Sequence, residues 1–530
     1  MRYYLNLLCL LIFAYACQST DETANTPTEA SGPLAYDALQ YDASLYPFYY
    51  GVASGDPATN QVTIWTKVVP QEAAASVEVS WKIATDSLFT DVVKNGTYTT
   101  DSANHHTVKV RVEDLQPDQY YYYRFQAMGA ESIIGRTKTT PTGDTDELRF
   151  AVVSCNNYEG GYFVAFDKIA NRNDLDAVLH LGDYIYEYGP GVYGDSTNGR
   201  FHEPPYEIIN LGDYRTRYAQ YRLDKDLMRM HQMHPVIAIW DDHEIANNAY
   251  VSGAQNHQPD EEGPYDQRRS AAVQAYFEWM PLEDNPNQQL YRSFRFGNMA
   301  ELMMLDERLA GRDQPVDSLS DPAYASEERS LLGEEQFNWL EERLTTSEAK
   351  WKIIGNQVIF SDLYTGIVYG VERNLDAWDG YPASKQQVAG AIRDNGVQNV
   401  IILSGDTHTS WAFETAINPT QPGQYDPETA QGAFAVEFGT PSISSGNIDE
   451  SIPTDSATRI AEMLKASQYN PHLKYVNLSE HGYLILSLRE DEAQAEWYFM
   501  DDIQKPQSNE YLAKAYRVAE GEHKLEEVID

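Results

Sequence analysis

The sequence predicts an α/β domain that follows an all-β domain, and two observations carry this prediction. From Tyr46 to about Thr140 the chain consists of short alternating segments separated by turn residues, with no long helical period. After the polar break "TTPTGDTDE" the pattern changes, because apolar strands alternate with helical segments such as "GYFVAFDKIANR". Such alternation is typical of α/β proteins.

The first region has a specific signature of a β-sandwich. The stretch "LQPDQYYYYRF" places Leu115, Pro117 and Tyr121 as in the tyrosine corner of immunoglobulin-like domains. We therefore predict a fibronectin type III or immunoglobulin-like domain over residues 46–140. The predicted strands of this region are residues 61–68, 76–83, 106–112, 120–128 and 132–139.

The second region is predicted to run over residues 146–505, followed by a tail over 506–530. Its predicted strands include residues 148–155, 176–181, 236–240, 300–305, 351–355, 399–404, 434–438, 483–488 and 495–500. In the tail, Gly521 lies where a short hairpin would turn.

Composition excludes several classes of partner. The 530 residues include 80 Asp and Glu against 39 Lys and Arg, for a formal net charge of -41. Such a charge repels nucleic acid backbones and anionic lipid surfaces. We expect no nucleic acid binding through a basic surface.

The N-terminus is typical of an exported protein. An early Arg2 precedes an apolar run from Leu7 to Ala14, which is too short to span a bilayer as a helix. Ala16 followed by Cys17 resembles the acylation site of bacterial lipoproteins. We predict a signal peptide over residues 1–16, a lipid on Cys17 and a flexible tether over 17–45, with ordinary signal cleavage as the alternative. The predicted location is the outer membrane or cell surface, otherwise the periplasm.

Polar residues follow strand after strand of the α/β region. The strands end in Ser154-Cys155-Asn156, Gly182-Asp183, Asp241-Asp242-His243, Leu305-Asp306, Gly355-Asn356 and Gly405-Asp406-Thr407-His408. Ligands of open α/β sheets collect beyond the carboxyl ends of the strands. The sequence therefore predicts a single crevice lined by metal-binding side chains. Two or more cations bound in such a crevice would suit the hydrolysis of phosphate esters.

These motifs together carry a family resemblance. The set "SCNNYEGGYF", "HLGDYIYE", "IWDDHEIANN", "GNQVIF", "DAWDGYPAS", "LSGDTHTSW" and "EFGTPSISS" resembles the PhoD-type alkaline phosphatases from about Tyr46 to Asp501. The resemblance implies an α/β metallophosphatase with a calcineurin-like β-sandwich core and flanking helices.

The resemblance also implies a ligand set. Cys155, Asp183, Tyr186 and His408 would hold Fe³⁺, and Asp183 would bridge to Ca²⁺. Asp242, Asn356 and Asp406 would face Ca²⁺. Thiolate, phenolate and imidazole suit iron, whereas carboxylate and amide oxygens suit the hard calcium ion.

Two further residues are implied to be catalytic. His243 would hydrogen-bond a substrate oxygen or protonate the leaving group. Arg308 in "LDERLAGR" resembles a family arginine near the phosphate, although Glu307 stands where an uncharged residue is expected.

The implied activity is that of a secreted alkaline phosphatase acting on phosphate monoesters and diesters. Two alternatives stay open at this point: a phospholipase D-like phosphodiesterase of the same family, and a non-catalytic calcium-binding surface protein. The expected partners are phosphate ester substrates, with membrane contact only through Cys17.

Overall fold

The computed structural model describes residues 36, 38–71, 75–194, 196–285 and 287–529. The predicted signal peptide, the lipid on Cys17 and most of the predicted tether lie outside these residues. No helix in the described part of the chain is long and apolar enough to cross a membrane.

A large mixed sheet forms one half of the core. In spatial order its ten strands are β22 (Glu526–Ile529), β21 (Glu510–Ala519), β20 (Glu492–Met500), β19 (Gly482–Leu488), β9 (Leu148–Val153), β10 (Ala177–His180), β11 (Pro235–Ala238), β1 (Val52–Gly55), β2 (Val62–Lys67) and β5 (Thr107–Val112). Strands β9, β10 and β11 are parallel. The predicted C-terminal hairpin is confirmed, since β21 and β22 pair antiparallel, and both strands extend this sheet.

A second sheet forms the other half. Its order is β12 (Arg292–Phe296), β13 (Ala300–Met304), β14 (Trp351–Gly355), β15 (Val400–Ser404), β17 (Ala433–Gly439), β16 (Ser410–Ala416) and β18 (Leu473–Asn477). Strands β13, β14, β15 and β17 are parallel. The parallel strands of both sheets were predicted from their apolar runs.

The two sheets pack face to face around one core. Val152 and Leu484 of the first sheet share a cluster of buried side chains with Leu302 and Ile353 of the second. The rings of Phe150 and Phe296, one from each sheet, lie 4.9 Å apart between centroids. Alternation along the strands sends the next residues, such as Ile354, to the other face of the second sheet.

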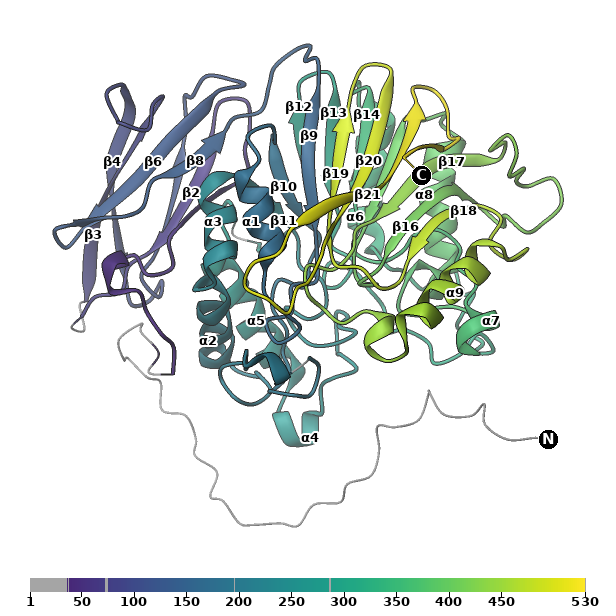
Figure 1. Cartoon of the computed structure of the whole chain (residues 1–530), viewed down its shortest axis with the longest axis horizontal. Helices are drawn as coiled ribbons and strands as arrows, with labels where there is room; N and C mark the ends of the chain where they lie inside the picture. The colour runs from purple at the N-terminus through teal and green to yellow at the C-terminus, as the bar shows by residue number, and fades with distance from the viewer. Residues whose placement is uncertain (1–35, 37, 72–74, 195, 286, 530) are drawn as a thin grey trace.

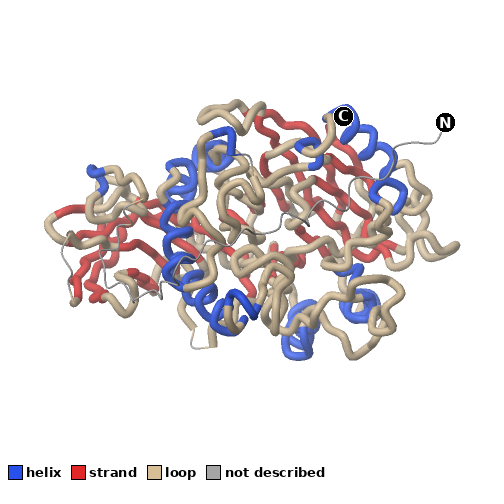
Figure 2. The backbone as a smooth tube through the Cα atoms, turned by 90° about the horizontal axis from the view of Figure 1, so that it is seen from below, coloured by secondary structure: helices blue, strands red, loops and turns tan. Residues whose placement is uncertain are grey.

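Helices cover the outer faces of the two sheets (Figures 1 and 2). The outer face of the second sheet packs against α6 and α8. In Figure 1, α1, α2, α3 and α5 lie beside the first sheet. The helices are α1 (Val164–Asn171), α2 (Leu211–Arg222), α3 (Lys225–Met233), α4 (Pro259–Glu262), α5 (Tyr265–Trp279), α6 (Gly333–Thr346), α7 (Gly366–Tyr369), α8 (Pro382–Arg393) and α9 (Thr454–Lys465).

The N-terminal region lies at one end of the molecule (Figure 1). Its second sheet has the order β4 (Val92–Asp101), β3 (Ser76–Ala84), β6 (Tyr120–Ala127) and β7 (Ala130–Glu131), and β8 (Gly135–Lys138) pairs with β6. This sheet packs on β1, β2 and β5 around a separate core. The predicted tyrosine corner is present, because the Tyr121 hydroxyl accepts a hydrogen bond from the Gln116 amide at 2.8 Å. Strand β1 pairs in parallel with β11, so β1, β2 and β5 of this region are part of the large sheet.

Candidate metal centre

The carboxyl ends of the parallel strands of both sheets meet at one place, as the sequence predicted. Cys155 follows β9, Asp183 follows β10 and Asp242 follows β11, while Asp406 and His408 follow β15 of the opposite sheet. A parallel bridge between Ser154 and Ser442 joins the two sheets beside this place.

The backbone turns sharply at the predicted ligands. Cys155, Asp183, Asp406 and His408 have φ angles of 59°, 56°, 59° and 63°. This left-handed conformation is uncommon for residues other than glycine, and such strain clusters at functional sites. Gly182, which precedes Asp183, cannot be replaced without a clash, since a Cβ there would lie 2.4 Å from Cβ of Asp241.

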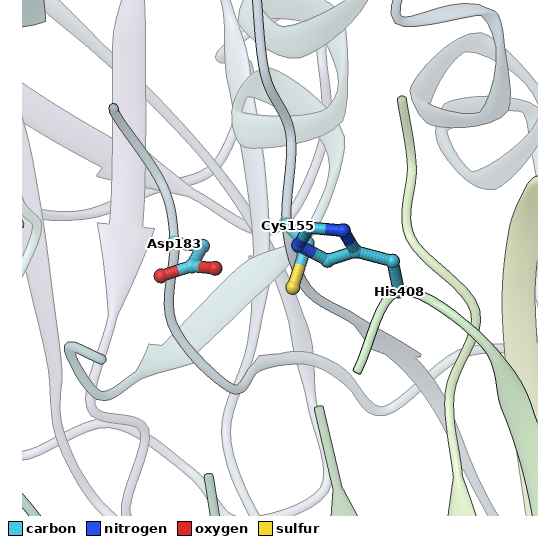
Figure 3. Close-up of side chains that lie close together, drawn as sticks. All are labelled: Cys155, Asp183 and His408. Atoms are coloured by element: carbon cyan, nitrogen blue, oxygen red, sulfur yellow. The ribbon is translucent and has the colours of Figure 1, made fainter. Parts of the chain in front are cut away.

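Candidate ligand side chains form three adjoining groups, and all of them are buried except the partly buried Asp406. The groups are Cys155 with Asp183 and His408, Asp183 with Asp242 and His243, and Asp241 with Asp242 and Asp406, and in each group the ligand atoms lie within 4.8 Å of one another. Figure 3 shows the first group, whose members arise from separate segments. Asp183 and Asp242 each belong to two groups, so the three form a continuous cluster.

The Tyr186 phenol lies inside the first group. Its oxygen is 2.9 Å from Oδ2 of Asp183 and 3.2 Å from Nε2 of His408. Ser445, which follows β17, donates a hydrogen bond to the same oxygen at 2.6 Å. The structure thus brings together all four side chains predicted to hold iron.

Three carboxylate oxygens of the cluster have no hydrogen-bond partner among the described residues. They are Oδ1 of Asp183, Oδ2 of Asp241 and Oδ1 of Asp242, and all are buried. Burying an unpaired carboxylate oxygen costs several kcal/mol, on the order of 2–7 for a neutral polar group and more for a charged one. Bound cations would satisfy these oxygens, so the residues present fit a metal centre.

Burial and neighbouring carboxylates raise the pKa values of several acidic groups in the cluster. Burial raises the pKa of the Cys155 thiol well above its usual value, and the Asp183 carboxylate adds to this effect. Burial also raises the pKa of Asp241 to about 8 and that of Asp406 to about 7, although Arg308 opposes both shifts. Additional positive charge would therefore favour the ionised ligands.

Arg308 brings a buried positive charge to the carboxylates of the cluster. Its guanidinium is fully buried and donates to Asp241, to Asp376 at 2.7 Å and to Asp406 at 3.2 Å. Asp242 lies 3.8 Å away. The guanidinium is thus hydrogen-bonded to carboxylates of the protein. Its contact with a substrate stays a prediction.

His243 is held by a carboxylate that sequence reasoning missed. Its Nδ1 lies 2.7 Å from Oε2 of the fully buried Glu187. Burial would lower the pKa of His243, but Asp242, Glu187 and Asp183 outweigh it and raise the pKa well above its usual value. Since Nδ1 faces Glu187, Nε2 is the ring nitrogen available to a substrate or an ion.

The Asn356 side chain is held by hydrogen bonds at both ends of its amide. Its amide oxygen accepts a hydrogen bond from Nε1 of Trp378 at 2.8 Å, and its amide nitrogen donates to Ser404 at 3.0 Å and to the Val358 carbonyl. Within the described residues these contacts fix the amide beside the cluster, and its calcium ligation stays a prediction.

Glu307 has a structural role that explains the departure from the expected uncharged residue. Its Oε2 accepts hydrogen bonds from the backbone amides of Gln357 at 2.9 Å and Val358 at 3.0 Å, and Oε1 accepts one from Trp378 at 2.9 Å. The carboxylate therefore holds the loop after β14.

Comparison with known protein families identifies the family. The PhoD-like phosphatase model matches residues 150–497, and the model of the PhoD-like phosphatase N-terminal domain matches residues 34–141. The chain belongs to the PhoD-like phosphatase family.

Individual relatives agree with this membership in the PhoD-like phosphatases. The chain is 36% identical over 480 residues to alkaline phosphatase D of Bacillus subtilis (strain 168), covering 87% of this chain and 79% of that protein. A solved structure described as that of PhoD superposes with a TM-score of 0.82 at 33% identity, covering 92% of this chain and 93% of the other. These comparisons place the chain among the phosphate ester hydrolases.

Two tyrosines over this PhoD-like site were also missed from the sequence. The ring of Tyr193 stacks on Tyr186 at 5.7 Å and on His243 at 5.9 Å between centroids, and Tyr188 lies 5.4 Å from Tyr193. The segment that carries them follows the "GDYIYE" motif, but no local pattern indicates that it folds back over the ligands.

Proposed function

We propose that the chain is an exported, metal-dependent alkaline phosphatase that hydrolyses phosphate monoesters and diesters. The observation that carries the proposal concerns Asp183. Its carboxylate belongs to one group that offers sulfur and nitrogen atoms and to a neighbouring group in a region rich in carboxylates. Adjacent cations of different kinds would fit such a site. Membership in the PhoD-like family and the named relative support the activity.

The donor chemistry supports iron in one half of the site. Cys155, Tyr186 and His408 offer thiolate, phenolate and imidazole, which suit Fe³⁺ together with Asp183. Asp242 and Asp406 offer hard oxygens that suit Ca²⁺, and Asn356 would join them if its amide oxygen also faces the ion.

Bound in this position, the ions would supply Lewis-acid polarisation of the phosphoryl group. The side chains contribute the rest. His243, fixed through Glu187, holds a proton on Nε2 that can pass to the oxygen of the leaving alcohol. Arg308 places positive charge among the carboxylates and keeps them in position for a phosphoryl group.

We also propose a fold for each of the two regions. Two face-packed sheets with flanking helices support a calcineurin-like sandwich. The separate core of the first region and its Tyr121 hydrogen bond support a fibronectin type III or immunoglobulin-like domain that shares a sheet with its neighbour.

Export and anchoring rest on the sequence. We propose that residues 1–16 are removed and that Cys17 carries a lipid, which would be the only membrane contact. Cells that express the protein should incorporate labelled palmitate into it, and Cys17→Ser should abolish the labelling. Labelling that persists in Cys17→Ser would contradict the anchor.

The activity is tested on purified protein. Elemental analysis should detect iron and calcium, and the visible spectrum should contain a phenolate-to-iron band. Both p-nitrophenyl phosphate and bis-p-nitrophenyl phosphate should be hydrolysed at alkaline pH. A preparation that contains calcium but cleaves neither compound would instead support a non-catalytic calcium-binding protein, and a strong preference for phosphatidylcholine would support the phospholipase D-like alternative.

A further inference from the structure

A cavity of about 230 Å³ lies beside the metal centre. The segment that follows β14 and the turn from Asp406 to Trp411 form its walls, together with the short helix η4 (Ile448–Glu450). Ile359, Leu363, Ala377, Trp411 and Ile448 contribute apolar surface. Most of these side chains belong to, or pack against, the hydrophobic cluster beneath α9.

Several polar groups of the cavity wall are already paired with protein atoms. Nε1 of Trp411 donates to Thr407 at 3.0 Å and to Thr409 at 2.8 Å. Asp379 accepts hydrogen bonds from Lys385 at 2.5 Å and from Arg373 at 2.9 Å. A polar occupant would find few free partners here, so the cavity suits an apolar group.

The cavity adjoins the acidic cluster through a shared residue. Asp406 lines the cavity and also pairs with Arg308 inside the cluster at 3.2 Å. A phosphoryl group bound among the carboxylates would therefore place one of its ester substituents at the cavity mouth.

We propose that this cavity binds the apolar ester group of the substrate, a short alkyl chain or a single aromatic ring. The inference rests on the proposed phosphatase function and adds the substrate class that the site prefers. A volume of about 230 Å³ holds a chain of a few carbons or one ring, whereas two long acyl chains exceed it. Leu363 and Ile448, which are both partly buried, are then specificity-determining residues.

The test measures binding and hydrolysis as a function of chain length. Methyl-, butyl-, hexyl- and phenylphosphonate are titrated into the metal-loaded protein by calorimetry, and kcat/KM is measured for the corresponding phosphate esters. Complete burial of one methylene corresponds to about a fourfold gain in affinity. We expect about a tenfold or larger gain from methyl- to butylphosphonate, and a plateau once the cavity is filled.

Two variants locate the effect. Leu363→Trp and Ile448→Trp each fill the cavity and should bring the affinities for butyl- and methylphosphonate close to each other. Met463→Trp adds the same side chain at an exposed position of α9 and should retain the wild-type ratio of the two affinities. Having two cavity variants guards against the failure of either one to fold.

Each outcome decides the inference. Equal affinity for all chain lengths, no binding of any phosphonate, or a length preference that persists in both cavity variants would overturn it. If the binding preference is present and sensitive to both variants but no ester is hydrolysed, the binding site stands and the proposed phosphatase function fails.

Discussion

The Tyr186 phenolic oxygen lies 2.9 Å from Oδ2 of Asp183 and 3.2 Å from Nε2 of His408, which follow strands of opposite sheets. A single oxygen therefore joins two predicted ligands from distant parts of the chain, since His408 follows Tyr186 by 222 residues. This contact has direct consequences for spectroscopy and activity.

Tyr186→Phe should abolish the visible absorption band and reduce kcat/KM by about 100-fold, because the variant lacks the phenolate that the iron site would use. Absorption and p-nitrophenyl phosphate hydrolysis are measured on the same sample. Tyr218→Phe is the matched control, since its buried hydroxyl has no hydrogen-bond partner among the described residues. An unchanged band in Tyr186→Phe would refute phenolate ligation.

Cys155→Ser and Asp183→Asn should each leave less than about 1% of the activity while the circular dichroism spectrum stays native. Both substitutions nearly preserve volume but remove a charged donor from the cluster. Asp174→Asn, at a half-exposed ion pair with Arg149, is the control and should remain active. Wild-type-like turnover by either site variant would defeat the ligand assignment.

Arg308→Met should destabilise the protein by about 3–5 kcal/mol in EDTA, because three carboxylates lose a buried positive partner. Added Ca²⁺ should recover part of this loss, since it supplies charge to the same carboxylates. Urea unfolding with EDTA and with Ca²⁺ measures both effects. Arg215→Met removes an ion pair with Glu278 instead, and its loss should not respond to Ca²⁺.

A pH effect on stability is expected from Lys67 of β2. Burial lowers the pKa of its ammonium group to about 7, although Glu278 acts in the opposite direction. Between about pH 7 and the ordinary value of 10.5 the unfolded chain binds a proton that the folded chain lacks. The free energy of unfolding therefore rises with pH through this range, and the penalty is fully present below it.

The comparison of wild type with Lys67→Met isolates this contribution. The wild-type free energy of unfolding should increase relative to that of the variant from about pH 7 to about pH 9.5, as followed by urea unfolding in buffers of equal ionic strength. A difference that is constant or that falls with pH would show that Lys67 remains charged in the folded protein.

The sequence predicted the strands that carry the site better than the elements that surround them. The apolar runs before Cys155, Asp183 and Asp406 form β9, β10 and β15, because buried parallel strands have an unbroken apolar pattern. A surface helix is recognised by an apolar stripe that recurs every three to four residues. Helix α2 lacks a clear stripe, since its buried residues include Arg217 and Arg222, and it was not predicted.

The convergence of the predicted ligands could be foreseen, because these motif residues closely follow the parallel strands. Side chains that act through others were not foreseen. Glu187 and Ser445 lie within quoted motifs, but their partners His243 and Tyr186 are 56 and 259 residues away in the sequence, so the motifs alone do not reveal these contacts. The hydrogen bond from Trp378 to Asn356 was not foreseen for the same reason, since Trp378 lies 22 residues further along the chain.

The pairing of Ser54 with Pro235 and of Gly55 with Val236 attaches the first β-rich region to the strand that delivers Asp242. The two regions are consequently joined by strand pairing and cannot move independently as two linked domains would. A shortened polypeptide starting at Leu148 would leave the edge of β11 open to self-association. Evolutionary or engineered replacement of the leading region would thus have to supply a new neighbour for that strand.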